Sequence, residues 1–169
     1  KRFVDWLHRE NKNFLFLTNS SQRSPKELRQ KLQRMGLDVE EQHFYTSALS
    51  TAEFLRNQEP GCSVYCIGEA GLHNALYEAG ISMNDVDPDY VVVGETENYN
   101  YQSIAKAVLL VQAGARLICT NPDLTGPGDG GVMLPACRAL VSPIELSTGC
   151  SAYFLGKPNP LMMRTGIRL

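Results

Sequence analysis

Residues 64–121, VYCIGEAGLHNALYEAGISMNDVDPDYVVVGETENYNYQSIAKAVLLVQAGARLICTN, decide the fold. The stretch contains three short apolar runs, each followed by a polar turn, at residues 64–67, 90–93 and 116–119. Between the runs lie two amphipathic segments with apolar residues at helical spacing, each closed by a glycine. Gly68 and Gly94 are 26 residues apart, and Asn121 follows Gly94 by 27 residues. This rhythm predicts successive β–α units of a parallel sheet, each helix crossing over to the next strand.

The residues before this stretch predict a further strand and two helices. A continuously apolar run at residues 14–17 is typical of a strand buried on both faces of a parallel sheet. A helix follows it, because Ser24 suits the N-cap, Pro25 suits the first helical position and Glu27 completes a capping box. Apolar residues at helical spacing near Phe3 predict one more helix at the beginning of the chain.

After the last of the three runs comes a glycine-rich segment, residues 124–131. Its Gly126, Gly128 and Gly131 match G-x-G-x-x-G, but the match neither follows a strand directly nor begins a helix, so we interpret it as a mobile loop. Pro135 then opens a helix that Pro143 should interrupt or kink. A last strand at 153–155 and a final helix complete an α/β fold. We expect one central parallel sheet with strands at 14–17, 64–67, 90–93, 116–119 and 153–155.

Composition excludes several classes of protein. The chain has 169 residues, a formal charge of −2, 43% hydrophobic and 20% charged residues, as in ordinary globular domains and unlike disordered chains. It has no run of Lys and Arg, so we expect no nucleic-acid partner. No apolar run reaches the about 18–20 residues of a membrane helix, so we expect no membrane partner. The five cysteines form no Cys-x-x-Cys pair, which favours buried free thiols in a cytoplasmic protein.

Both ends of the chain lie inside helical patterns. The sequence begins without Met, and it stops at Ile167-Arg168-Leu169 with no capping residue or helix stop signal. We therefore expect the chain to be an internal fragment of a longer protein.

Two strand ends carry residues suited to binding an anion. In open α/β sheets, ligands sit beyond the carboxyl ends of the strands. Thr18-Asn19-Ser20-Ser21 stands between a strand and a helix N-terminus, where hydroxyls, backbone N–H groups and the helix dipole can bind phosphate. The same turn could equally satisfy only its own backbone. Lys157 lies directly after the last strand, between Gly156 and Pro158, although a surface lysine is the commoner role for this residue type.

Other polar residues have structural explanations. Glu69 and Glu95 each follow a glycine at a strand end, and the N-terminus of the next helix is a sufficient reason for a carboxylate there. His8, His43 and His73 are scattered and form no recognisable triad with a Cys, Ser or acid, so we expect packing or surface histidines.

Five segments, taken in order, resemble the NagD-like phosphatases of the haloacid dehalogenase superfamily; they are residues 17–21, 44–48, 93–95, 120–123 and 156–160. The resemblance implies Rossmann-like core pieces with a large inserted α/β cap domain. By this analogy, residues 1–40 and 151–169 are core pieces and residues 41–150 are the cap. It also allows a homo-oligomer formed through the cap.

The resemblance assigns roles to four residues. Thr18, Asn19 and Ser20 match the motif that binds the phosphoryl oxygens, and Lys157 matches the catalytic lysine that neutralises charge on nucleophile and phosphate. The family's nucleophilic D-x-D-G motif has no match, since Asp5 is the only aspartate before the first strand, and no G-D-x-x-x-D follows Lys157. Mg²⁺ is therefore expected for the full-length enzyme, with ligands that this chain lacks, and no metal ligand is predicted within the chain.

Two hypotheses about function follow. In the first, the full-length parent is a Mg²⁺-dependent phosphatase that hydrolyses a small soluble phosphate monoester through an aspartyl-phosphate intermediate. In the second, the scaffold is a non-catalytic module that binds a phosphate ligand or a partner without the catalytic aspartates. Neither hypothesis names the ester, because loop residues such as 124–131 do not distinguish a sugar, a nucleotide or glycolate.

Overall fold

The computed structural model describes all residues, Lys1–Leu169. Its helices are α1 (Arg2–Arg9), α2 (Pro25–Arg34), α3 (Ser47–Gln58), α4 (Ala70–Glu78), α5 (Tyr101–Gln112), α6 (Cys137–Thr148) and α7 (Pro160–Arg168). Its strands are β1 (Phe16–Thr18), β2 (Phe44–Thr46), β3 (Ser63–Ile67), β4 (Ser82–Met83), β5 (Tyr90–Val93), β6 (Arg116–Cys119), β7 (Thr125–Pro127), β8 (Met133–Pro135) and β9 (Tyr153–Phe154). Two 3₁₀ turns are η1 (Glu41–His43) and η2 (Asp129–Gly131). None of the helices combines the length and the apolar character that a membrane span requires.

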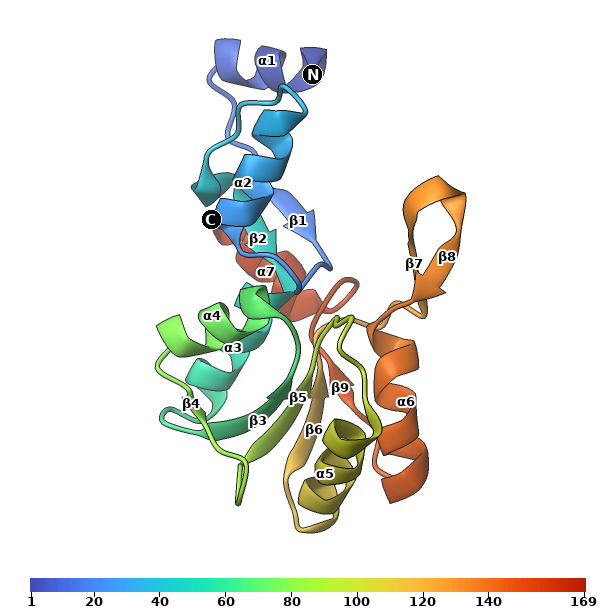
Figure 1. Cartoon of the computed structure of the whole chain (residues 1–169). Helices are drawn as coiled ribbons and strands as arrows, with labels where there is room; N and C mark the ends of the chain where they lie inside the picture. The colour runs from blue at the N-terminus through green and yellow to red at the C-terminus, as the bar shows by residue number, and fades with distance from the viewer.

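A five-stranded parallel sheet forms the larger unit, with the strand order β4-β3-β5-β6-β9. Helices α3 and α4 cover one face of this sheet, and α5 and α6 cover the other (Figure 1). The predicted alternation of strands and helices is therefore confirmed, and the predicted strands at 90–93 and 116–119 match β5 and β6 residue for residue.

The central strand β5 explains the two layers. Its four residues are all buried, as expected for a strand covered on both faces. Because successive side chains point to opposite faces, Tyr90 and Val92 join the apolar cluster under α3 and α4. Val91 and Val93 join the cluster under α5 and α6. An uninterrupted apolar run thus supplies both halves of the core.

The smaller unit contains a separate two-stranded parallel sheet. β1 pairs with β2, with Phe16 opposite Phe44 and Thr18 opposite Thr46, and the prediction that residues 14–17 join the central sheet is wrong. From the sequence, the segment at 44–46 indicates only the start of a helix, because Thr46 is also the N-cap of α3, its Oγ1 accepting from the Leu49 N–H at 3.2 Å. α2 and α7 lie beside this small sheet, and α1 lies beyond α2 at the end of the molecule (Figure 1).

Two of the strand pairings cross the expected domain boundaries, which stay predictions. β2 lies beyond residue 40, yet it pairs with β1 in the smaller unit. β9 lies beyond residue 150, yet it pairs with β6 at the edge of the five-stranded sheet. Each expected boundary rests on analogy, and pairing over such short strands leaves little trace in the sequence.

The capping prediction for α2 is confirmed. The Glu27 N–H donates to Ser24 Oγ at 3.3 Å, and the Ser24 N–H donates to Glu27 Oε2 at 2.7 Å. Pro25 occupies the first turn. This helix begins where its sequence indicates, because the capping interactions are local.

The glycine-rich segment is a β-hairpin. β7 and β8 pair antiparallel and project from the end of the five-stranded sheet (Figure 1). Gly130 and Gly131 turn the chain with φ of +70° and +80°, values that favour glycine. The interpretation of this segment as a mobile loop missed these two strands, because a pairing of three residues in each strand follows no apolar pattern.

α6 begins at Cys137, two residues after Pro135, and continues through Pro143 as one helix. The predicted interruption at Pro143 does not occur. Val141 and Ile144, on either side of the proline, are fully buried against the five-stranded sheet. Their packing holds the helix together where one backbone hydrogen bond is lost.

Candidate phosphate-binding site

The two predicted parts of the site meet at the ends of strands from different sheets. Lys157 follows β9, Thr18 ends β1, and the Lys157 Nζ donates to the Leu17 carbonyl oxygen at 3.0 Å. The two residues of this hydrogen bond are 140 positions apart in the sequence. Both Thr18 and Lys157 are half-buried. Lys157 thus reaches the residue next to Thr18, although β1 and β9 belong to different sheets and not to the rim of one sheet.

The hydroxyls of the turn after β1 remain available to a ligand. Thr18 Oγ1 accepts from the Ser20 N–H at 3.2 Å, and it donates to no group of the chain. The Ser20 hydroxyl makes no hydrogen bond, and Ser20 is half-buried. Together with Lys157, these two hydroxyls supply one positive charge and two neutral donors at one place, a combination that suits an oxyanion.

The next residue of the turn, Ser21, is fully buried and anchored to the five-stranded sheet. Its N–H donates to Glu95 Oε2 at 3.0 Å, and its Oγ accepts from the Glu95 N–H at 3.0 Å. The Thr120 hydroxyl donates to the same Oγ at 3.2 Å. Gly94 permits this approach, since a Cβ there would lie 2.9 Å from Ser21 Oγ. The turn is thus held against the ends of β5 and β6.

The carboxylates of Glu95 and Glu69 both bind segments that are distant in sequence. Glu95 stands well before the N-cap of α5, which is Asn100, and its carboxylate holds Ser21. Glu69 is the N-cap residue of α4, but its side chain caps no helix. It accepts instead from the Thr96 hydroxyl at 2.8 Å. The explanation by a helix N-terminus is therefore wrong for Glu95, whereas Glu69 does lie at the N-terminus of α4 and also binds a loop that is distant in sequence.

Asn121 and Asp123 belong to one of the motifs found in the sequence, but sequence reasoning assigned them no role. Asn121 is fully buried, and its Nδ2 donates to the Asn19 carbonyl oxygen at 2.8 Å. Asp123 is exposed, and its Oδ2 accepts from Asn19 Nδ2 at 2.9 Å. Their position at the carboxyl end of β6 was the available signal.

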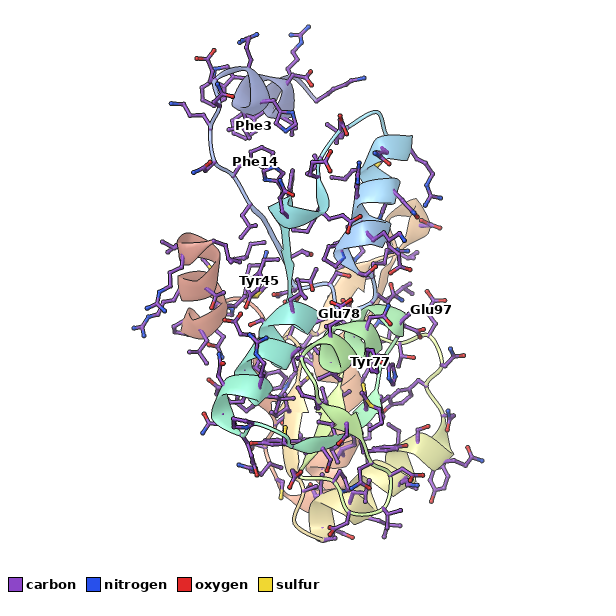
Figure 2. The ribbon with its side chains drawn as sticks, turned by 90° about the vertical axis from the view of Figure 1, so that its left-hand side faces the viewer. Phe3, Phe14, Tyr45, Tyr77, Glu78 and Glu97 are labelled. Atoms are coloured by element: carbon purple, nitrogen blue, oxygen red, sulfur yellow. The ribbon has the colours of Figure 1, made fainter.

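None of the thiols or histidines hydrogen-bonds to Thr18, Ser20 or Lys157, although Cys137 Sγ accepts from Asn121 Nδ2 at 3.2 Å. All five cysteines are free; Cys62, Cys119 and Cys137 are buried, whereas Cys150 is exposed and departs from the expectation. Burial and the neighbouring Cys137 raise the pKa of Cys119, so this thiol stays neutral. His43 stacks on Phe14 at a centroid distance of 4.1 Å, as a packing histidine. Phe14 and Phe3 lie at the end of the molecule far from the five-stranded sheet (Figure 2).

The residues of this chain do not form a magnesium site on their own. Nowhere do three or more His, Cys, Asp or Glu side chains gather closely enough to hold a metal ion. The carboxylates nearest the turn, Glu95 and Asp123, are engaged with Ser21 and Asn19. A hard cation needs several oxygen ligands, so no step of a reaction is assigned to Mg²⁺ on these residues.

A parallel α/β fold with donors for an oxyanion at its strand ends has close counterparts among known proteins. The profile of the haloacid dehalogenase-like hydrolases matches residues 1–82. A dihydroxyacetone phosphatase from Corynebacterium glutamicum is 43% identical over 166 residues, which are 98% of this chain and 60% of that relative. The chain belongs to the haloacid dehalogenase-like hydrolases.

Solved structures place it more narrowly. A double-mutant thermostable NPPase from Geobacillus stearothermophilus superposes with a TM-score of 0.94 at 35% identity, covering 99% of this chain and 67% of that one. NagD from E. coli K-12 superposes with a TM-score of 0.89 at 40% identity, covering 99% and 65%. The chain is a member of the NagD/p-nitrophenyl phosphatase subfamily, and it spans about 60% of the length of the curated relative.

Proposed function

We propose that the full-length parent of this chain is a phosphatase acting on a small soluble phosphate monoester. The observation that carries the proposal is the meeting of Lys157 with the end of β1, where its Nζ lies 3.0 Å from the Leu17 carbonyl oxygen, next to Thr18. Relatives whose names describe phosphatases, among them the dihydroxyacetone phosphatase, support the reaction class.

The residues of this chain would bind and stabilise the phosphoryl group. The Lys157 ammonium supplies a full positive charge, and the hydroxyls of Thr18 and Ser20 donate to phosphoryl oxygens. Such preorganised donors are most effective where negative charge accumulates in the transition state, in a site partly shielded from water. Buried Ser21 and Asn121 hold the turn in place, so little reorganisation is needed when the ester binds.

The nucleophile and the proton donor belong to other parts of the parent in this proposal. A carboxylate nucleophile would attack phosphorus and form an aspartyl-phosphate, and water would then release inorganic phosphate. Mg²⁺, when bound by carboxylates outside this chain, would offset the charge between nucleophile and phosphate. We assign to this chain the phosphate-binding half of the site only.

The two sheets suggest how the parent is divided. The smaller unit, with β1 and β2, would belong to the catalytic core, and the five-stranded sheet with α4, α5 and α6 would form the cap. The candidate site would then lie where the two meet, which fits the anchoring of the turn at Thr18–Ser21 to β5 and β6.

Phosphate release by the full-length protein tests the function. The protein with Mg²⁺ is assayed against p-nitrophenyl phosphate, dihydroxyacetone phosphate and a set of sugar phosphates and nucleotides. We expect turnover of at least one ester that disappears on removal of Mg²⁺ with EDTA and returns on its addition. Binding of these esters without any release of phosphate would instead favour the non-catalytic module.

A further inference from the structure

The Asn19 side chain has no N–H left for a ligand. Its Nδ2 donates to Asp123 Oδ2 at 2.9 Å and to the Lys157 carbonyl oxygen at 3.2 Å. A primary amide has two N–H donors, so both are used. Its Oδ1 accepts from the Lys157 N–H at 2.7 Å, and an oxygen cannot donate to phosphate in any case.

The same contacts bind the backbone of Lys157 on both sides. The Asn19 amide accepts from the N–H of Lys157 and donates to its carbonyl oxygen, as a neighbouring strand would. The Lys157 Nζ then reaches the end of β1, at the Leu17 carbonyl oxygen. The position of the ammonium group therefore depends on a side chain of the opposite turn.

Gly156 leaves space for the hydrogen bonds between the Asn19 side chain and the Lys157 backbone. A Cβ at Gly156 would lie 2.8 Å from Asn19 Oδ1 and 2.7 Å from the Thr120 carbonyl oxygen, so only glycine allows the chain to pass between them. On the other side, Asn19 is held through its carbonyl oxygen by Asn121 Nδ2 at 2.8 Å and by the Ser47 hydroxyl at 2.6 Å. The Asn19 residue is thus fixed before it binds Lys157.

We infer that Asn19 is a positioning residue for Lys157 and that its side chain does not bind phosphate. This inference rests on the proposed function and narrows the expectation that Asn19 binds the phosphoryl oxygens, because it excludes the side chain. Asp123 supports this role, because its carboxylate accepts from Asn19 Nδ2 and so orients the amide. In that orientation Nδ2 faces the Lys157 carbonyl oxygen and Oδ1 faces the Lys157 N–H.

A double-mutant cycle in the full-length enzyme tests the inference. Asn19→Ala should lower kcat about 10-fold to 100-fold in the otherwise unchanged enzyme, and less than about 2-fold in a Lys157→Ala background. A side chain that bound phosphate itself, or only kept the turn folded, would cost a similar factor in both backgrounds. That result would overturn the inference. Gln22→Ala is the matched control, because the Gln22 side chain makes no hydrogen bond and should leave kcat unchanged.

A second pair of variants covers the case in which Asn19→Ala lowers the melting temperature. Asn19→Asp keeps the shape but places a carboxylate opposite Asp123, so kcat should fall. Adding Asp123→Asn removes the repulsion between the two carboxylates and restores their hydrogen bond in the reverse order, so kcat should recover in part, by at least about 3-fold, with the KM for p-nitrophenyl phosphate little changed. Recovery stays incomplete because a carboxylate at position 19 cannot donate to the Lys157 carbonyl oxygen. If a folded double variant shows no recovery of kcat, Asp123 does not act on Lys157 through residue 19, and this part of the inference is wrong.

The two proposals fail in different ways. If the unmodified full-length protein releases no phosphate from any ester, the proposed function is wrong. If it is active and Asn19→Ala is as active as Gln22→Ala, only the positioning role of Asn19 is wrong.

Discussion

Lys157 and Thr18 meet at one strand end but can contribute very different amounts to catalysis. Lys157 brings a formal charge to a half-buried place, and its Nζ is already aimed at the end of β1. Thr18 brings one neutral hydroxyl, whose oxygen is engaged with the Ser20 N–H. Hydrogen bonds from charged donors are roughly twice as strong as neutral ones, and the difference grows where water is excluded.

Exchange of these residues in the full-length enzyme should show the difference. Lys157→Ala should lower kcat by about 10²–10³-fold, the range found on removal of a single transition-state donor. Thr18→Ala should lower it about 10-fold, since a neutral hydrogen bond contributes about 0.5–1.5 kcal/mol. Steady-state kinetics on p-nitrophenyl phosphate would measure both. Comparable losses, or a Lys157→Ala variant with normal kcat, would contradict the proposed roles of the two residues.

At the scale of elements, local signals were sufficient wherever an element is defined by its own residues. The capping box of Ser24 and Glu27 marked the beginning of α2, and it forms as predicted. The apolar run at β5 marked a strand covered on both faces, and all its residues are buried. In each case, the interaction that fixes the element is within a few residues or follows from simple burial.

Elements that depend on a distant partner were missed or misplaced. β1 looks like a strand of the main sheet, but it pairs with β2, and a short apolar run does not indicate which strand will lie beside it. The β7–β8 hairpin has only three residues in each strand. At the candidate site, Thr18 and Lys157 could be predicted because each directly follows a predicted strand. The hydrogen bonds between Asn19 and Lys157 join residues 138 positions apart and leave no local pattern in the sequence.

The joint between β2, α3 and α7 gives a prediction about alkaline stability. Tyr45 of β2 lies beside α7 (Figure 2), is buried, and donates to Glu53 of α3 at 2.7 Å. Burial first, and then the Glu53 carboxylate, raise the pKa of Tyr45 to about 12. The phenol of an unfolded chain ionises near pH 10. Between these values the folded state keeps a proton that the unfolded state has lost.

The contribution of Tyr45 to the free energy of unfolding should therefore be constant below about pH 10 and fall as the pH rises toward about 12. Tyr45→Phe should flatten that fall, as measured by urea unfolding at several pH values. It should not abolish the fall, because burial also raises the pKa of Cys66 and of Tyr90 to about 12. A Tyr45→Phe profile parallel to that of the unmodified protein would show that Tyr45 does not contribute.

At the scale of the whole molecule, the candidate site belongs to neither sheet alone. The turn at Thr18–Ser21 comes from the smaller unit, while Glu95, Thr120 and Asn121 at the ends of β5 and β6 hold it. Lys157 arrives from β9, the edge strand of the larger sheet. Relative placement of the two units therefore sets the distance between the hydroxyls and the ammonium group, which makes the junction itself part of the binding geometry.

Since the proposal assigns only phosphate binding to these residues, it leads to a prediction about the 169-residue chain by itself. Its donors at Thr18, Ser20 and Lys157 can stabilise phosphate charge, but none of them can act as the carboxylate nucleophile or as the paired acid and base. No cluster of carboxylates is present to hold a hard cation. We therefore expect no phosphate release from p-nitrophenyl phosphate and no Mg²⁺ binding by titration calorimetry, whereas the full-length parent should show both. Turnover by the isolated chain that is lost in Lys157→Ala would show that the nucleophile lies within these residues, and the assignment of the chain to the phosphate-binding half would then be wrong.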